Sequence, residues 1–388
     1  MLRTTFLACA IVLTAGVVVP SSPAIAQTTH VAYVYVSNLV SPNTSTKHDI
    51  YAYGARADGS LYRVYGTPLP VDVGSLWVDG KYLLGLNGNL IDSYLISSTG
   101  NLQLVGTMDA AAHATDACGV TGPLKVDHSG QYVYNAIVSG DCEGFSFQTF
   151  GISSTTGKLT YKSTSDEIFA GGSELDFLGN NNFAYSPVCT VFDHEEVGYI
   201  YDFKRSSTGA LSSLQIGNTD PVPQNTSNDY CPLTIAADPT NHLAVLQQET
   251  DFDGTTYGTP VIATYTAAST GNLTTTSTYK NMPHTRSGSR VMRMDPSGKL
   301  LAVGGSNGLE IFHYHGANPV TYAKTLLTTG AIQSLYWDHS NHLYALTWST
   351  TGNGKLYVFT VTTTGASQAP GSPHSIPNPD SLIVRATT

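Results

Sequence analysis

The tetrapeptide Thr-Gly-x-Leu recurs along this chain, and each copy ends a segment in which apolar and polar residues alternate. Complete copies begin at Thr99, Thr156, Thr208 and Thr270, with degenerate copies around Gly59 and Gly365. Counted along the turn glycines Gly59, Gly100, Gly157, Gly209, Gly271, Gly316 and Gly365, the spacing is 41 to 62 residues. A period of this length with four short strands per unit is typical of a β-propeller. We therefore expect an all-β protein built from four-stranded antiparallel blades.

The number of blades follows from one strand type that begins just after a polar turn. Its members are rich in Tyr, Val and Leu, as buried or half-buried strands require. They are Tyr33–Ser37, Tyr82–Leu86, Tyr132–Ala136, Phe183–Ser186, His242–Leu246, Leu300–Gly304 and His342–Leu346. Seven such strands predict seven blades.

An innermost strand precedes each of these turns, except in the first blade. The six inner strands are Leu76–Asp79, Leu124–Asp127, Leu175–Leu178, Ile235–Asp238, Met292–Asp295 and Leu335–Asp338. Most end on an Asp that we interpret as a turn former rather than a metal ligand. The last residues, Leu382–Arg385, have the composition of the missing strand. We predict that the C-terminal strand completes the first blade and closes the ring.

The inner strands share a second pattern, because two apolar positions flank one variable position. The variable residues are Trp77, Lys125, Asp176, Ala236, Arg293 and Tyr336. Since strand side chains alternate between faces, the apolar pair should pack between blades and the variable residue should face the central channel. Glu174 and Ser334 should lie one layer nearer its mouth.

Two interpretations of this ring are open. In the first, opposite charges line a water-filled pore and satisfy one another. In the second, the ring is an anion-binding or catalytic funnel, in which Lys125 and Arg293 attract a carboxylate or sugar acid. In that case Lys125, Asp176, Arg293, Trp77 and Tyr336 are the substrate-binding candidates.

The first 26 residues have the pattern of a secretory signal, with Arg3, an apolar run and an Ala24-Ile25-Ala26 cleavage site. The run is shorter than the roughly 20 residues that span a bilayer. We predict cleavage, no membrane span afterwards, a periplasmic or extracellular location, and one propeller domain over residues 27–388.

The cysteines of the mature chain agree with export. They are Cys118, Cys142, Cys189 and Cys231. Four cysteines in an oxidising compartment predict two disulfides with three possible connectivities. The pairs nearest in sequence would each link loops within one blade or between neighbours. No CxxC spacing supports a zinc site or a redox dithiol.

Charge and composition limit the partners. The net charge is −10 and the pI is about 5.5, so a broad basic surface for nucleic acid or anionic membrane is not expected. We predict no metal, no cofactor and a monomer. The expected partner is a small lactone or carbohydrate, or an extracytoplasmic protein.

The segment Gly288–Leu301 (GSRVMRMDPSGKLL) resembles a motif of the seven-bladed lactonase family, which includes 6-phosphogluconolactonases and cycloisomerases that form muconolactones. In that family Gly-Pro-Arg-His precedes an apolar strand and a Pro-Asp-Gly-Lys turn. Arg290 matches the family arginine, while Val291 stands in place of the histidine. The Asp-initiated turns, the Thr-Gly-x-Leu hairpins and the blade count extend the resemblance over the mature chain.

The resemblance implies a carboxylic ester hydrolase that opens a sugar lactone or related cyclic ester at the channel mouth without a metal, and the signal-like segment predicts that this enzyme is exported. Such a reaction needs a base to activate water and a cation to stabilise the oxyanion. His113 or Glu174 would be the base, and Arg290 with Arg293 would hold the substrate. The alternative is a non-catalytic propeller whose loops bind a carbohydrate or a protein.

Overall fold

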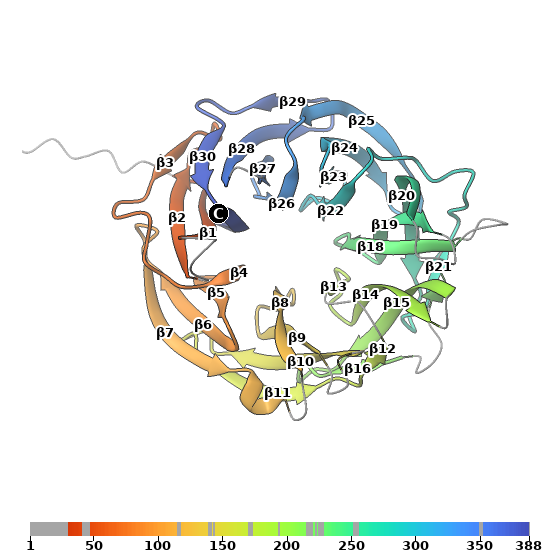
Figure 1. Cartoon of the computed structure of the whole chain (residues 1–388), viewed down its shortest axis with the longest axis horizontal. Coiled ribbons are helices and arrows are strands. Elements are labelled where there is room, and N and C mark those ends of the chain that lie inside the picture. The colour runs from red at the N-terminus through yellow and green to blue at the C-terminus, as the bar shows by residue number, and fades with distance from the viewer. Residues whose placement is uncertain are drawn as a thin grey trace, which may run out of the picture.

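The computed structural model describes residues 30–40, 47–114, 118–138, 142, 144–169, 174–192, 195–214, 220–221, 223, 229–250, 256–348 and 352–387. The predicted signal segment 1–26 lies outside these residues. The described strands form seven antiparallel sheets, which Figure 1 shows as blades arranged in a ring. The seven-bladed, all-β architecture is thus confirmed. In the described part of the chain the single helical element is a short 3-10 turn, η1 (Ala111–His113).

The first blade joins the two ends of the chain. It consists of β1 (Ala32–Leu39), β2 (His48–Ala55), β3 (Leu61–Arg63) and β31 (Pro379–Ala386). The C-terminal strand β31 pairs with β1 along its length, from Ala32 opposite Ala386 to Asn38 opposite Pro379. Figure 1 shows the C-terminus at this blade. The predicted closure is therefore confirmed, and it gives the inner edge of β1 a hydrogen-bonding partner.

The other blades run from the inside outward in chain order. Blade 2 contains β4 (Gly74–Asp79), β5 (Tyr82–Asn87), β6 (Leu90–Ile96) and β7 (Leu102–Asp109). Blade 3 contains β8 (Gly119–Val126), β9 (Tyr132–Val138), β10 (Gly144–Ile152), β11 (Leu159–Thr164) and β12 (Ile168–Phe169). Blade 4 contains β13 (Asp176–Phe177), β14 (Phe183–Phe192), β15 (Glu195–Arg205), β16 (Leu211–Ser213) and β17 (Asp220–Pro221).

The remaining three blades complete the ring. Blade 5 contains β18 (Asp229–Ala237), β19 (His242–Thr250), β20 (Thr256–Ala267) and β21 (Leu273–Thr275). Blade 6 contains β22 (Ser289–Met294), β23 (Leu300–Gly305), β24 (Gly308–His315) and β25 (Asn318–Thr328). Blade 7 contains β26 (Ile332–Trp337), β27 (His342–Thr347), β28 (Asn353–Thr362), β29 (Gly365–Gln368) and β30 (His374–Pro377). The short strands β12, β17 and β30 pair with the third strand of their blades, so the outer edge of those blades is interrupted.

The core consists of apolar layers between neighbouring blades. Leu335 and Trp337 of β26 pack in the layer shared with blade 6, whereas Tyr336 between them contacts the layers toward blades 1 and 2. In β31, Ile383 takes the position equivalent to Tyr336 and is buried against blade 2. The predicted alternation along the inner strands is therefore confirmed.

The Thr-Gly hairpins connect the third and fourth strands of their blades, and each contacts the preceding blade. Gly209 has a φ of +82°, and a Cβ there would lie 2.4 Å from the Tyr132 ring of blade 3. The Tyr134 hydroxyl donates a hydrogen bond to the Gly209 carbonyl at 2.8 Å. Equivalent bonds run from Tyr35 to Gly100 at 2.9 Å and from Tyr185 to Gly271 at 2.6 Å. The repeat therefore joins blades as well as turning the chain.

Three turn aspartates, Asp238, Asp295 and Asp338, hold their turns through backbone amides, in line with the predicted role as turn formers. Asp338 Oδ1 accepts hydrogen bonds from the Ser340 and His342 amides at 2.7 and 2.9 Å. Its Oδ2 is 2.8 Å from His342 Nδ1 and accepts from the Tyr344 hydroxyl at 2.9 Å. Burial opposes ionisation, but these bonds prevail and lower the pKa of Asp338.

Two disulfides pair the cysteines nearest in sequence. Cys118–Cys142 lies within blade 3, with the Cα atoms 5.6 Å apart. Cys189 in β14 is bonded to Cys231 in β18, with the Cα atoms 5.1 Å apart, so this bridge links blades 4 and 5. Such bonds persist in oxidising compartments. Among the described residues, no helix has the length and apolar character to cross a bilayer.

Candidate functional site

A cavity of about 560 Å³ opens at the end of the channel where the inner strands turn back. We call it the turn-side cavity. All six variable residues of the inner strands line it, and residues of the turns form its wall: Asp79, Asp127, His128, Ser129, Gly130, Pro296 and His339. The volume lies in the range of small-molecule sites. The cavity therefore brings together the five predicted substrate-binding residues: Trp77, Lys125, Asp176, Arg293 and Tyr336.

Lys125 and Asp176 form an ion pair at the centre of this cavity. Lys125 Nζ donates a hydrogen bond to Asp176 Oδ1, and both side chains are largely buried. The other carboxylate oxygen accepts a hydrogen bond from the Ala237 amide at 2.8 Å. Burial alone would raise the pKa of Asp176, but the charge and hydrogen bond of Lys125, with the Ala237 amide, lower it. For this pair, the interpretation of mutually satisfied charges holds.

Arg293 differs from Lys125 because its guanidinium has no such partner. Within the described residues it makes no hydrogen bond or ion pair of its own; its carbonyl accepts a bond from Trp337 Nε1 at 3.2 Å. The guanidinium carbon lies 5.9 Å from the centroid of the Trp77 ring, as a cation–π contact. A half-buried guanidinium with free donors can bind a carboxylate in a bidentate way.

Asp79 is a feature of this cavity that the sequence interpretation missed. The longer turns supply partners to their aspartates: backbone amides to Asp238, Asp295 and Asp338, and a serine side chain to Asp127. The shortened Asp79-Gly80-Lys81 turn supplies none, and the described residues give the Asp79 carboxylate no hydrogen bond. Burial and the nearby Asp127 raise its pKa to about 6. The shortened turn was the signal that could have marked it, since the turn residues that bond the aspartates of the longer turns are missing there.

Aromatic side chains form the apolar part of the turn-side cavity. The rings of Trp77 and Tyr336 lie 6.5 Å apart with an interplanar angle of 71°. Lys125 Nζ lies 4.9 Å from the Trp77 ring centroid, so two cations border one indole. Burial raises the pKa of Tyr336, which keeps its hydroxyl protonated and able to donate.

A smaller cavity of about 120 Å³ lies where the inner strands begin, and we call it the strand-start cavity. Glu174, Thr234, Arg290 and Ser334 line it together with Arg293, which borders both cavities. Burial raises the pKa of Glu174 above the ordinary range, although the Arg293 charge and the Thr234 hydroxyl oppose this. Glu174 is therefore a stronger base than an exposed glutamate and lies within the electrostatic reach of a cation.

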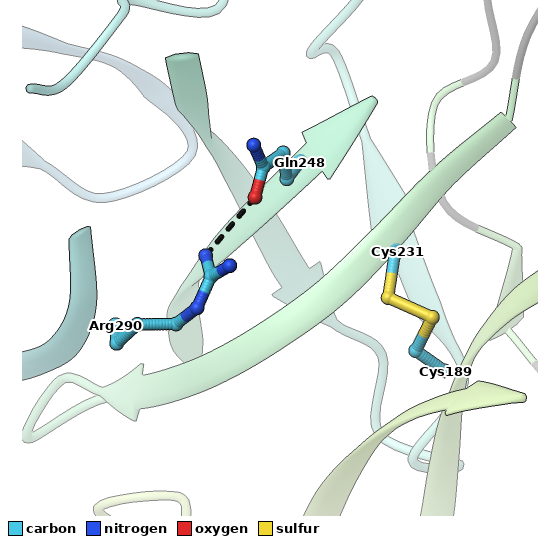
Figure 2. The surroundings of a disulfide bond; sticks show 4 residues. All are labelled: Cys189, Cys231, Gln248 and Arg290. Atoms are coloured by element: carbon cyan, nitrogen blue, oxygen red, sulfur yellow. Dashed lines mark hydrogen bonds between the residues drawn. A yellow bond between two sulfur atoms is a disulfide. The ribbon is translucent and has the colours of Figure 1, made fainter. Parts of the chain in front are cut away.

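Arg290 lies at the rim of the strand-start cavity and is exposed. Its guanidinium donates hydrogen bonds to Gln248 Oε1 at 3.0 Å and to the Ser289 carbonyl at 3.1 Å. Figure 2 shows Arg290 and Gln248 beside the Cys189–Cys231 disulfide. Gln248 is the partner of Cys231 in the β18–β19 ladder. The disulfide thus joins β14 to β18, the strand that pairs with the one carrying the Gln248 partner of Arg290.

His113 lies apart from the other candidate residues. It ends η1, between the outermost strand of blade 2 and the first strand of blade 3. Its ring stacks on Tyr161 of the outer strand β11, with centroids 4.3 Å apart and an interplanar angle of 4°. It lines neither cavity. The structure therefore brings Glu174, Arg290 and Arg293 to one place and puts His113 elsewhere.

No group of three or more His, Cys, Asp or Glu side chains is arranged to hold a metal ion among the residues that the structure describes. The two cavities are lined by three cations, Lys125, Arg290 and Arg293, by two carboxyls with raised pKa, and by aromatic rings.

Comparisons with known proteins identify the fold. No protein-family model matches the chain, and no curated protein matches it either. A solved protein of Lactobacillus plantarum superposes with a TM-score of 0.63 at 15% identity, covering 92% of this chain and 100% of the other. A hypothetical selenium-binding protein of Sulfolobus tokodaii gives 0.62 at 11% identity, covering 92% and 94%.

A "putative 6-phosphogluconolactonase" from Bacteroides fragilis is a more distant neighbour. It superposes with a TM-score of 0.47 at 12% identity, covering 94% of this chain and 100% of its own. At such identities the similarity shows the propeller fold, and a fold of this kind carries many unrelated functions. The function must be argued from the site.

Proposed function

We propose that the protein is an exported propeller whose central channel binds a small sugar acid or its lactone. One observation carries the proposal: Arg293 presents an unpartnered guanidinium inside the turn-side cavity, beside an aromatic ring. A buried or half-buried cation without a hydrogen-bonding partner is costly, and a bound anion relieves that cost. The carboxylate of a sugar acid is such an anion.

The other side chains of the turn-side cavity suit the rest of a sugar acid. The free carboxyl group of Asp79 can accept hydrogen bonds from ligand hydroxyls. The Tyr336 ring offers an apolar face to the C–H groups of a sugar ring, whereas Trp77 is bordered by the Lys125 and Arg293 cations. The Lys125–Asp176 pair, which is already satisfied, holds the wall of the cavity in place.

Hydrolysis of the lactone form is the second candidate function, and Glu174 is the observation that favours it. Burial raises its pKa, which makes the Glu174 carboxylate a stronger base than that of an exposed glutamate. Glu174 would take a proton from water as the water oxygen bonds to the lactone carbonyl carbon. Arg293 would stabilise the resulting oxyanion. The ring C–O bond then breaks, and the leaving alkoxide recovers the proton from Glu174, so that a hydroxy acid is released.

Calorimetric titration with galacturonate, gluconate and neutral galactose tests the binding function. We expect the two acids to bind and galactose to bind far more weakly. Arg293→Gln should weaken the binding of the acids about 30-fold, the size of a lost charge-assisted contact. Arg286→Gln is the matched control, since this exposed arginine lies outside both cavities. Wild-type affinity in Arg293→Gln would contradict the proposal.

Hydrolysis is tested separately with gluconolactone and galactonolactone in a pH-stat, with and without a chelator. Glu174→Gln should lower kcat by about 100-fold or more while the affinity for the acid is kept. His113→Ala should leave the rate unchanged if Glu174 is the base. Acid binding without any lactone turnover would restrict the function to binding. Loss of turnover on adding the chelator would overturn the metal-free mechanism.

The location of the protein is part of the proposal. The signal-like segment 1–26 and the two disulfides support export, and the partners expected there are a small molecule or an extracytoplasmic protein. Expression of the full chain in a bacterial host should yield a monomer that begins at Gln27. Mass spectrometry of the secreted or periplasmic fraction checks the cleavage site. Retention of residues 1–26 in the cytoplasm would contradict export.

A further inference from the structure

An open groove of about 570 Å³ runs outward from the turn-side cavity over blade 3. We call it the lysine groove. It shares two lining residues with the turn-side cavity, Ser129 and Gly130, so that the two spaces border the same turn. From there it crosses the start of β9 and the end of β10 and reaches β11 on the outer edge of the blade.

The lining of the lysine groove is cationic and rich in hydroxyl groups. Lys158 and Lys162 line it with exposed side chains, and Ser153, Ser154 and Thr160 add hydroxyls. Among the described residues that line it, none carries a carboxylate. On a chain whose net charge is −10, this groove is a local surface suited to anions.

Two glycines, Gly130 and Gly151, line the lysine groove at places where a side chain would collide with a neighbour. Gly130 has a φ of +64°, and a Cβ there would lie 2.5 Å from the Asp79 carboxylate. At Gly151 a Cβ would lie 2.7 Å from Lys162 Cε. The absence of side chains at both positions leaves room for Asp79 at the junction and lets Lys162 lie across the floor of the groove.

We propose that the lysine groove extends the central site, and that the natural ligand is an acidic oligosaccharide rather than a single sugar acid. This inference rests on the proposed function. One sugar acid would occupy the turn-side cavity with its carboxylate on Arg293. The following residues would lie along the groove, with their carboxylates toward Lys158 and Lys162 and their hydroxyls toward the serines and Thr160.

The side chains favour a saccharide over other anionic polymers. The groove is lined mainly by hydroxyls, amines and glycines, which match a ligand with many hydroxyl groups. Its aromatic residue, Tyr132, is already covered by the Arg205 guanidinium, 5.0 Å from the ring centroid. A nucleic-acid strand would need free aromatic faces for its bases along the path.

The experiment is a titration of the full mature protein with mono-, di-, tri- and tetragalacturonate at low ionic strength. Affinity should rise with chain length, and the rise should shrink as salt is added, because the lysines are exposed. Lys158→Ala/Lys162→Ala should lower the affinity for the tetramer about tenfold, the size of two exposed ion pairs, and leave the monomer unaffected. Lys280→Ala/Lys355→Ala is the control, since both lysines are exposed and line neither space.

The outcomes separate the two proposals. A monomer affinity that depends on Arg293 but does not grow with chain length would overturn the extended ligand and keep the central site. Equal binding of neutral oligosaccharides, or tighter binding of polyglutamate or of an oligonucleotide of matched charge, would also overturn it. Failure of every uronate to bind would overturn the proposed function together with this inference.

Discussion

The hairpins at the rim and the inner strands at the channel occupy equivalent places in every blade, yet their sequences behave in opposite ways. In four of the blades the hairpin repeats a Thr-Gly pair before a leucine, and these hairpins pack on an aromatic residue of the preceding blade: Gly100 on Tyr33, Gly157 on Tyr82, Gly209 on Tyr132 and Gly271 on Phe183. The variable position of the inner strands carries an indole, an amine, a carboxylate, a methyl group, a guanidinium and a phenol in turn.

The difference teaches how the two regions are constrained. In these four blades the hairpin makes the same packing contact with the preceding blade, so the same residue types recur there. The channel residues all face one shared space. Identical charged residues there would repel one another, and identical neutral residues would give the cavity no distinct binding groups. Sequence repetition marks the contacts that hold the ring, and its breakdown marks the surface available to a ligand. The following predictions test this contrast.

The largest effect on stability is expected at the rim. Gly209→Ala should destabilise the protein by about 3 kcal/mol, because it combines a positive φ with overlap between the new Cβ and the Tyr132 ring. Gly66→Ala is the matched control: its φ is +85°, but a Cβ there meets nothing within 4 Å, so about 1 kcal/mol is expected. Chemical denaturation measures both. Equal losses would show that the contact between blades contributes little.

A smaller effect is expected for the one channel pair that is structural. Lys125→Met should cost about 2 kcal/mol of unfolding free energy, because it leaves the Asp176 carboxylate buried without its cation. Asp176→Asn on that background should recover part of the loss. A double-mutant cycle measures the coupling. If the two changes are additive, the pair does not act as the unit described above.

Removal of a single hydrogen bond between blades should cost less again. Tyr185→Phe deletes the hydroxyl that donates to the Gly271 carbonyl and should lower the free energy of unfolding by about 1 kcal/mol. Tyr279→Phe, at an exposed position, is the control. A loss of the same size in both variants would show that the hydrogen bond between blades does not contribute to stability.

Acidification should destabilise the ring through the carboxylates whose pKa is lowered. Asp338 and Asp176 both belong to this class. Their contribution is present above the pKa of an unfolded aspartate, about 3.9, and is lost as the pH falls through their lower folded values. Glu174, whose pKa is raised, has the opposite sign. Thermal melts from pH 7 to pH 2 should fall less steeply in Asp338→Asn than in wild type; parallel curves would refute this role.

The smallest effect on stability is expected for Arg293, despite its central position. Its guanidinium makes no hydrogen bond within the described residues, and Glu174, whose pKa burial already raises, can take up a proton when the Arg293 charge is removed. Arg293→Ala should therefore change the free energy of unfolding by less than about 1 kcal/mol. The same variant should lose the stabilisation that a bound sugar acid gives to the wild type. A loss of several kcal/mol without ligand would make Arg293 a structural residue and contradict its role as an anion anchor.

Most of the fold could be predicted because it follows from local patterns. The Thr-Gly period, the seven strands rich in Tyr, Val and Leu and the Asp turns predicted seven four-stranded blades, and the composition of Leu382–Arg385 predicted the closure with β1. The register of the inner strands also predicted which side chains line the channel, because alternation along a strand is a property of the backbone itself.

The candidate site was less predictable, since its chemistry depends on distances between blades. Lys125 and Arg293 occupy equivalent positions in the sequence pattern, but the neighbouring blade offers a carboxylate to Lys125 and no hydrogen-bonding partner to the Arg293 guanidinium. His113 and Glu174 were both candidate bases. The structure separates them, because His113 stacks on Tyr161 of the outer strand β11 whereas Glu174 lines the strand-start cavity. Asp79 was recognised as a candidate residue only in the structure, where the described residues give its carboxylate no hydrogen bond.

The sequence by itself therefore determined the number of blades, the order of their strands, the closure and the set of residues that face the channel. Each of these follows from a repeat along the chain or from the alternation of side chains within one strand. The tertiary structure decided which of three cysteine pairings forms, which cation of the channel has a hydrogen-bonded carboxylate and which does not, and that the central cavity and the lysine groove border the same turn. Those properties depend on side chains brought together from different blades, and electrostatic and steric contacts act over ångströms of space rather than positions in the chain.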